Sequence, residues 1–322
     1  MTRRSLLACS GLVLAQPWSS SLAADTGARK LRGIFPILQT PYTTDDAVDF
    51  AALEREVDFL DRCGVHGVVW PQRASQYQHL SFQERIEGAE RVVAAAKRKR
   101  PAVVIGVQAS DAATAVKYAK HASRIKPDAI IALPTSDRGE FDLNAIASYF
   151  VTIASACDLP LFVQTTGNMS VDFMIKLARQ IPTLQFVKDE AGDPVRRLEE
   201  FHQHAGPRVF TGNHGRTLID EMIRGVAGNM PASAWAELYV KAWDNWNLGK
   251  HALAFDAFSK AMLFVTEATE YGFPALHYVL HLRGIFPNAK TRGTEFPPLD
   301  DRAKEALRAT HEFVKPHLIA TA

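Results

Sequence analysis

Eight short apolar segments, each followed by a longer stretch, run through residues 33–249 and constrain the fold more than any other feature. Each segment is almost continuously apolar and is bounded by Gly, Pro or Asp, as expected for a strand buried on both faces. Eight such units in succession predict a closed (β/α)₈ barrel, or TIM barrel, over residues 31–249. A doubly wound open sheet would usually carry a Gly-rich phosphate-binding turn after its first strand, and none is present. The predicted strands are 34–38, 66–70, 102–107, 129–133, 161–164, 184–187, 208–211 and 226–230.

The intervening stretches have the periodicity of amphipathic helices. In residues 50–62, for example, Leu53, Val57 and Leu60 recur at helical spacing, with charged residues between them. After residue 249 the strand pattern stops, and three further helices are predicted at 252–266, 271–282 and 301–314. Residues 250–322 are therefore expected to form a helical extension that packs on the barrel or on a neighbouring subunit. Helices are also predicted within the barrel at 82–97, 112–124 and 143–157.

The first 24 residues have the order of parts found in an export signal. Arg3 and Arg4 precede an apolar run of about ten residues, and Ser-Leu-Ala-Ala follows before Asp25. The run is well short of the ~20 residues that span a bilayer, so we expect no stable membrane anchor. The arginine pair resembles a twin-arginine signal, and a general secretory signal with a chance pair is the alternative. We expect the mature chain to begin near Asp25 and to work in a bacterial periplasm.

The composition and net charge of the chain limit the kinds of molecule that it can be expected to bind. The chain of 322 residues is 47% hydrophobic and 22% charged with no biased tract, which excludes a disordered or fibrous protein. The net charge is +2, and removal of Arg3 and Arg4 with the leader would leave a neutral mature chain. Such a chain offers no basic stripe to nucleic acid or to an anionic membrane. Cys63 and Cys157 fall in separate predicted helices, so we expect free, buried thiols.

Candidate functional residues gather at the ends of the predicted strands, where barrel enzymes place their chemistry. Lys188 ends the sixth strand and is followed by Asp189 and Glu190. Burial in an interior strand disfavours the charged ammonium, and a neutral amine is the nucleophile that forms a Schiff base with a ketone or aldehyde. A loop lysine paired with Asp189 or Asp193 is the alternative interpretation. The other polar residues at strand ends are Gln72, Arg73, Gln164, Thr165, Asn213 and His214.

The histidine pairs do not indicate a metal site. His202 and His204, and also His277 and His281, have spacings that metal ligands can have, but no cysteine or carboxylate motif accompanies them. His277 and His281 share one helix face with leucines, which favours packing.

Several motifs occur in order along the mature chain. They are Thr40-Pro41-Tyr42, residues 64–68 with Leu80-Ser81, residues 158–161, residues 186–193 around Lys188, and residues 225–230. Together they resemble the superfamily of dihydrodipicolinate synthase and N-acetylneuraminate lyase, which are class I aldolases and dehydratases that act through a Schiff base. The resemblance covers nearly the whole mature chain. It implies a Schiff-base role for Lys188 and includes Thr40 among the residues expected to bind substrate.

The chain departs from the family pattern at all three positions of the usual proton relay. The family has Gly-Thr-Thr-Gly-Glu, whose threonines bind the substrate carboxylate, where residues 72–76 read Gln-Arg-Ala-Ser-Gln. The family's tyrosine after strand five is Gln164 here, and its aromatic pair after strand four is Thr135-Ser136. The arginine that the synthases use for a second carboxylate aligns with Met169. These departures argue against dihydrodipicolinate synthesis and ordinary sialic acid cleavage.

Other residues can take over these roles. Arg73 stands in the carboxylate-binding loop, where a guanidinium would hold a 2-keto acid carboxylate, unless it is an ordinary surface arginine. Glu190 follows Lys188 by two residues, so on an extended strand it points to the same side and can move a proton. A salt bridge between Glu190 and Arg197 or another basic neighbour is the alternative. Gln164 cannot act as an acid or base, so we expect it to orient the substrate. Gln72, Thr165 and Asn213 are also expected to bind substrate.

The sequence therefore predicts a lyase that forms a Schiff base with a 2-keto acid or a 2-keto-3-deoxy sugar acid. Lys188-x-Glu190 and residues 228–231 look more like the sugar-acid dehydratase and hydratase-aldolase branches than the synthase branch, and we favour dehydration over aldol cleavage. Because the protein amine supplies the electron sink, neither a metal nor an organic cofactor is expected. The alternative is a periplasmic binding or sensing protein on a decayed lyase scaffold. Related barrels are commonly tetramers or dimers, so a homotetramer or homodimer is expected.

Overall fold

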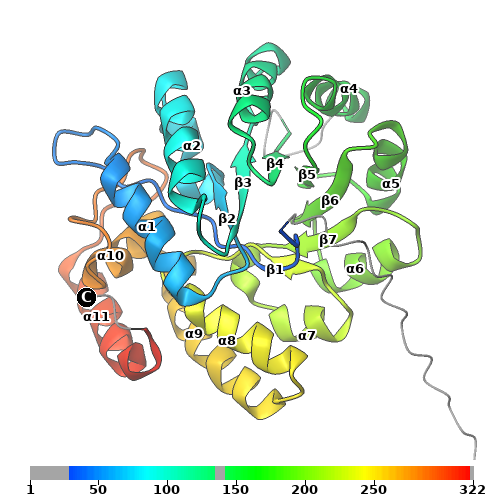
Figure 1. The fold of residues 1–322 in the computed structure, drawn as a ribbon. Coiled ribbons are helices and arrows are strands. Elements are labelled where there is room, and N and C mark those ends of the chain that lie inside the picture. Colours follow the sequence, from blue (N-terminus) through cyan, green and yellow to red (C-terminus); the bar gives the residue numbers. More distant parts are fainter. Residues whose placement is uncertain (1–28, 135–141, 320–322) are drawn as a thin grey trace, which may run out of the picture.

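The structure, a computed structural model, describes residues 29–134 and 142–319, and in it eight parallel strands surround a common axis with helices outside them (Figure 1). Neighbouring strands pair in sequence order from β2 to β8, and β8 also pairs with β1. Ile37 forms bridges with both Val69 and Ala232, and so closes the sheet between its two ends. The predicted TIM barrel is confirmed. The strands are β1 Gly33–Ile34, β2 Gly67–Trp70, β3 Ala102–Gly106, β4 Ala129–Ala132, β5 Leu161–Gln164, β6 Leu184–Asp189, β7 Arg208–Thr211 and β8 Gly228–Asn229.

The barrel helices begin at side-chain caps that can be read in the sequence. Each of the first six starts after an Asp or Ser whose side chain accepts a hydrogen bond from a backbone N–H of the first turn. These bonds satisfy N–H groups that have no partner within the helix. The helices are α1 Phe50–Cys63, α2 Phe82–Ala96, α3 Ala112–Ile125, α4 Leu143–Ala154, α5 Val171–Gln180, α6 Pro194–His202, α7 Leu218–Ile223 and α8 Ala236–Asn247.

Some predicted boundaries are wrong. The first and last strands, expected over 34–38 and 226–230, are two residues long. The first is short because Pro36 has no N–H to donate to the ladder, but the chain around Pro36 still lies in the barrel wall, where Leu38 N donates to Val69 O at 3.0 Å. Helix α4 ends at Ala154 instead of residue 157. Cys63 and Cys157 are free and buried, as predicted, but Cys157 lies beyond the helix.

Phenylalanines fill the inside of the barrel. Phe162 and Phe186 stack with ring centroids 4.3 Å apart, and Phe210 meets both edge-on. All three are fully buried. Because side chains alternate along a strand, every second residue beyond each of these rings also faces the barrel axis. A second, larger apolar cluster lies between the strands and the surrounding helices.

The C-terminal extension contains the three predicted helices, α9 His251–Tyr271, α10 Phe273–Leu282 and α11 Asp301–Val314, but α9 continues to Tyr271 instead of ending at residue 266. They lie beside α8 and α1 in Figure 1. A buried ion pair between Arg283 Nη2 and Glu237 Oε1, at 2.5 Å, joins the end of α10 to α8. Within residues 29–134 and 142–319, no helix is long and apolar enough to cross a membrane.

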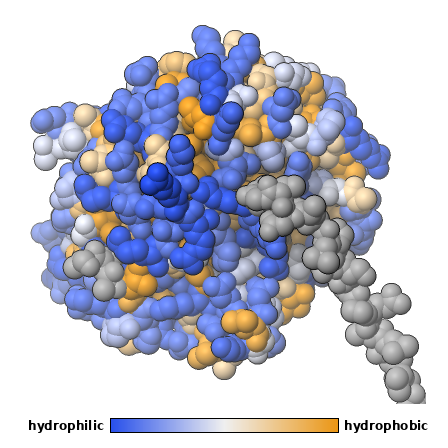
Figure 2. Space-filling model, viewed as in Figure 1, coloured by the Kyte–Doolittle hydropathy of each residue, from blue (hydrophilic) through white to orange (hydrophobic). Residues whose placement is uncertain are grey.

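The surface that Figure 2 shows is mainly hydrophilic, with hydrophobic residues in small groups. Large exposed apolar side chains of the extension and the turn before it are Leu248, Leu253, Phe255, Leu263 and Phe313. Two features of the sequence analysis lie outside the described residues. They are the predicted leader, residues 1–24, and Thr135-Ser136, which stand where the family has its aromatic pair.

Candidate active site

The strand register places Lys188 next to Gln164. β5 and β6 pair so that Phe162 lies opposite Phe186 and Gln164 lies opposite Lys188. Since Phe162 and Phe186 face the barrel axis, Gln164 and Lys188, two residues further on, face the axis as well. They emerge at the C-terminal end of the barrel, directly beyond the stacked phenylalanines.

Three side chains form a compact polar cluster at this point. The Lys188 Nζ lies 3.0 Å from Glu190 Oε1 and donates to Gln164 Oε1 at 3.1 Å. Gln164 Nε2 donates to Glu190 Oε2 at 2.5 Å, so the amide contacts both charged groups. The Lys188 side chain is 4% exposed and that of Glu190 is 26% exposed. The amine is therefore buried, while the carboxylate is open to a cavity.

The Glu190 carboxylate has room in the site because a glycine follows the neighbouring strand, β7. Gly212 follows β7 and is two residues beyond Phe210, so it faces the barrel axis. A Cβ atom at this position would lie 1.7 Å from Glu190 Oε1 and 2.9 Å from Lys188 Cε. The backbone N–H of Asn213 donates to Glu190 Oε1 at 3.2 Å. The glycine thus leaves room for the carboxylate, and the adjacent peptide group binds it.

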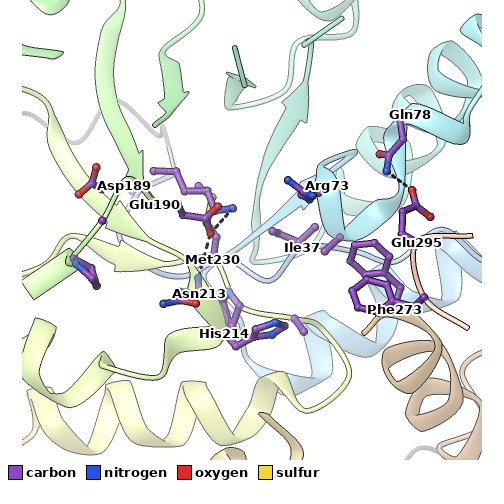
Figure 3. A pocket seen from close by; sticks show the side chains of 17 residues that line it. Ile37, Arg73, Gln78, Asp189, Glu190, Asn213, His214, Met230, Phe273 and Glu295 are labelled. Atoms are coloured by element: carbon purple, nitrogen blue, oxygen red, sulfur yellow. Dashed lines mark hydrogen bonds and ion pairs between the residues drawn. The ribbon is translucent and has the colours of Figure 1, made fainter. Parts of the chain in front are cut away.

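A cavity of about 460 Å³ opens beside this cluster (Figure 3). Lys188 and Glu190 contribute to its wall, as do Arg73, Asn213 and His214. Five of the residues singled out from the sequence therefore meet in one cavity. Figure 3 places Arg73 between Glu190 and the opposite end of the cavity, where Gln78, Phe273 and Glu295 lie. Volumes of this order are typical of small-molecule sites.

Thr165 lies on the other side of the strands and faces the helices. Its hydroxyl donates to Asp189 Oδ1 at 2.6 Å and accepts the backbone N–H of Glu190 at 3.0 Å. Asp189 is buried and also accepts two hydrogen bonds from Arg197, each of 2.8 Å. Arg197 therefore pairs with Asp189, not with Glu190. This network fixes the backbone that carries Glu190, and the substrate contact expected of Thr165 stays a prediction.

Thr40 and Gln72 lie below the cavity wall. Thr40 Oγ1 donates to Ser75 O at 2.7 Å and accepts Trp70 Nε1–H at 3.1 Å. Gln72 Nε2 donates to Gln108 Oε1 at 3.1 Å, and its own Oε1 is buried without a hydrogen-bond partner. Both residues support the loop that presents Arg73. Their predicted contacts with substrate also stay predictions.

The histidines have no arrangement suited to metal binding. Among the described residues, no group of three or more His, Cys, Asp or Glu side chains is placed to hold a metal ion. Burial lowers the pKa of His277 to about 4, and its ring packs between Tyr42 and Phe286. Burial also lowers the pKa of His214 at the cavity wall, so its imidazole is neutral near pH 7. His277 is a packing residue, as expected.

Part of the cavity wall was missed in the sequence. Gln78 follows the Arg73 loop, while Phe273, Glu295 and Phe296 belong to the C-terminal extension. None of these residues carries a motif, and the extension was expected only to pack on the barrel or on a neighbour. Their proximity to Lys188 arises from contacts between segments more than 200 residues apart, as the 2.8 Å bond from Gln78 to Glu295 shows.

Comparisons with known proteins agree with this architecture. A 4-hydroxy-tetrahydrodipicolinate synthase of Sphingopyxis alaskensis is 32% identical over 170 residues, which are 51% of this chain and 57% of that protein. An uncharacterized DapA-like lyase of Thermococcus kodakarensis is 24% identical over 79% of this chain and 90% of its own length. The chain thus spans little more than half the length of the synthase.

Solved structures share the fold. The dihydrodipicolinate synthase of Rhodopseudomonas palustris superposes with a TM-score of 0.81 at 21% identity, covering 88% of this chain and 98% of that one. YagE of Escherichia coli K12, solved in complex with pyruvate, gives a TM-score of 0.79 at 19% identity, with coverage of 88% and 98%. The family model described as the dihydrodipicolinate synthetase family matches residues 30–315. The chain therefore belongs to the dihydrodipicolinate synthetase family.

Proposed function

We propose that this protein is a lyase that forms a Schiff base between Lys188 and a 2-keto acid or 2-keto-3-deoxy sugar acid. The observation that carries the proposal is the buried Lys188 amine, which contacts both Glu190 and Gln164 at the end of a cavity of about 460 Å³. An amine in this position can reach a carbonyl carbon bound in the cavity. YagE, which has the same fold, was solved in complex with pyruvate, and this supports a keto acid as the ligand.

Glu190 is suited to the proton transfers. Lys188 adds to the C2 carbonyl, and loss of water gives an imine that withdraws electrons from C3. Glu190 then accepts a proton from C3, which leaves an enamine. When the enamine expels the C4 hydroxyl, Glu190 returns its proton to that oxygen, which departs as water, and hydrolysis of the imine frees Lys188. The net reaction is dehydration. For an aldol cleavage, Glu190 would instead accept the proton of the C4 hydroxyl from the imine, so that the C3–C4 bond breaks to give an aldehyde and an enamine; Glu190 then returns the proton to C3, and hydrolysis of the imine frees Lys188 and the shorter keto acid.

Arg73 and Gln164 would position the substrate. The Arg73 guanidinium in the cavity wall matches the geometry of a carboxylate and is proposed to hold C1 of the keto acid. Gln164 donates to Glu190 and accepts from Lys188, so it holds the base beside the nucleophile. An amide cannot act as a general acid or base, so we assign the proton transfers to Glu190.

We further propose that the substrate is not that of dihydrodipicolinate synthase. Gln164 stands where the family has its relay tyrosine, and Met169 stands where the synthases have an arginine for a second carboxylate. Met169 is fully buried, so it offers no group to such a carboxylate. The Met169 difference favours a substrate with a single carboxylate, and the Gln164 difference removes the family's proton relay.

A binding or sensing protein is the second candidate, because all three relay positions differ from the family pattern. A lyase would convert its keto acid to a product, whereas a binding or sensing protein would leave it unchanged. Proton NMR of the protein with 2-keto-3-deoxygluconate and related acids would follow loss of the C3 and C4 signals. A dehydrated keto acid establishes the dehydratase, and pyruvate with an aldehyde establishes the aldolase. Binding without any product would favour the sensor.

We also propose that the protein is exported to the periplasm and that it forms a dimer or tetramer. A leader with Arg3 and Arg4 would export the protein to the periplasm, and detection of a mature chain starting near Asp25 would test this. Self-association as a dimer or tetramer is supported by exposed apolar side chains such as Leu253 and Phe255 of α9. Light scattering of the purified protein would measure its mass.

A further inference from the structure

The end of the cavity opposite Lys188 is built by the segment between α10 and α11. Residues 287–299, called here the rim segment, lie against the loop that follows β2. Arg292 donates to both carboxylate oxygens of Glu84, at 2.7 and 3.0 Å, and to His79 O at 3.0 Å. Asn288 Nδ2 donates to Tyr42 O at 3.0 Å. These bonds fix the rim segment to the barrel although the two are distant in sequence.

Two consecutive residues of the rim segment reach the cavity. Glu295 Oε1 accepts Gln78 Nε2–H at 2.8 Å and lies 2.5 Å from His79 Nε2. Phe296 meets Phe273 edge-on, with ring centroids 5.2 Å apart. The Phe296 ring lies so close to Gly272 that a Cβ there would be 2.3 Å from it. Gly272 has φ of +63°, a conformation that glycine adopts without strain.

The cavity has room for a substrate larger than pyruvate. Figure 3 shows Glu190 at one end and Glu295 with Gln78 at the other, with Arg73 and Ile37 between them. Cavities of about 300–1,000 Å³ accommodate molecules much larger than a three-carbon acid. When the keto group is at Lys188, the distal part of a longer acid would extend toward Glu295.

The opposite end of the cavity is negatively charged. Burial by itself raises the pKa of Glu295, but the hydrogen bonds from His79 and Gln78 outweigh this and lower it. The carboxylate, whose side chain is 34% exposed, is therefore ionised at neutral pH. Among the described residues that line this end (Gln78, Phe273, Glu295 and Phe296), Glu295 alone carries a charge, and the His79 imidazole contacts its carboxylate at 2.5 Å.

We infer that Glu295 determines which substrates the site accepts. An ionised carboxylate at the far wall accepts hydrogen bonds from hydroxyl groups on the distal carbons of the substrate. It repels a substrate that ends in a second carboxylate or a phosphate, because like charges brought together in a cavity are unfavourable. The inference rests on the proposed Schiff-base function, since it takes Lys188 as the point where the keto group is held.

The test compares three keto acids on Glu295→Gln. Glu270→Gln is the matched control, because Glu270 is exposed on α9 and is not among the residues that line the cavity. The concentration that gives half-maximal borohydride trapping is measured for pyruvate, 2-oxoglutarate and 2-keto-3-deoxygluconate. In Glu295→Gln, we expect 2-oxoglutarate to bind about tenfold more tightly and 2-keto-3-deoxygluconate about tenfold more weakly, the effect of one charged hydrogen bond. Pyruvate, which does not reach the wall, should change less than about twofold. The control should match the unmodified protein.

Equal changes for all three acids, or no change for any, would overturn the inference. If nothing is trapped on the unmodified protein, the Schiff-base proposal fails, and a second measurement still tests Glu295. This second measurement is the rise in melting temperature that each acid produces in two variants: Lys188→Ala alone, and Lys188→Ala combined with Glu295→Gln. A reversal of the preference between 2-oxoglutarate and 2-keto-3-deoxygluconate would support the role of Glu295 without an imine. An unchanged preference would refute it.

Discussion

Replacement of Glu190 by Gln tests the division of roles within the polar cluster. The substitution keeps the shape of the side chain, and its carbonyl can still accept the Asn213 N–H that now binds Glu190 Oε1 at 3.2 Å. It removes the negative charge 3.0 Å from Lys188 Nζ and the only group in the cluster that we assign to proton transfer. Imine formation and proton transfer should therefore respond differently.

The sizes of the two effects follow from the contacts. Loss of a positioned acid–base group slows a reaction by about 10²–10⁴-fold, so turnover of Glu190→Gln should fall within that range. Imine formation needs the Lys188 amine but no proton transfer at C3, so borohydride trapping at saturating keto acid should change by less than about threefold.

The assay measures trapping and turnover of Glu190→Gln, with Glu200→Gln as the control. Glu200 is exposed on α6. If Glu190→Gln kept full turnover, Glu190 would not be the proton-transfer group. If trapping fell as far as turnover, Glu190 would be needed for imine formation and not for the proton at C3 alone.

Three further substitutions test other contacts. Gln164→Leu removes the hydrogen bonds of 3.1 Å to Lys188 and 2.5 Å to Glu190. We therefore expect kcat/KM to fall about tenfold, and a change under about twofold would refute this role for Gln164. Burial raises the pKa of Glu56 to about 8 from 4.5, so the folded protein binds a proton that the unfolded chain releases. Stability should therefore decline between pH 4.5 and 8, and Glu56→Gln should abolish that decline in melting temperature. Glu237→Ala leaves Arg283 buried without its partner, which should cost about 3–5 kcal/mol of unfolding free energy in urea; a loss below about 1 kcal/mol would contradict this.

Much of the fold could be predicted from local patterns. Continuous apolar runs identify strands that are covered on both faces, and the Asp and Ser residues before the helices supply their caps. The first strand is shorter than predicted because Pro36 has no N–H for the ladder, whereas no local pattern explains why α4 ends at Ala154. The alternation of side chains along a strand also predicted that Lys188 and Glu190 face the same side, and the two are in contact.

The rest of the site depends on contacts that no local pattern contains. Gln164 bridges Lys188 and Glu190 because of the register between β5 and β6, which a single strand does not reveal. Thr165 looked like a site residue because it ends a strand, but its position next to Gln164 turns it toward Asp189. Glu295 reaches the cavity only because the rim segment folds back over the barrel.

Formation of the Schiff base on Lys188 is the central claim, and borohydride trapping tests it most directly. The protein is incubated with pyruvate or 2-keto-3-deoxygluconate, reduced, digested and mapped by mass spectrometry. The account predicts a stable adduct on Lys188 with the mass of the reduced imine, and none in Lys188→Ala. Absence of an adduct with every keto acid, or an adduct on another lysine that persists in Lys188→Ala, would contradict it.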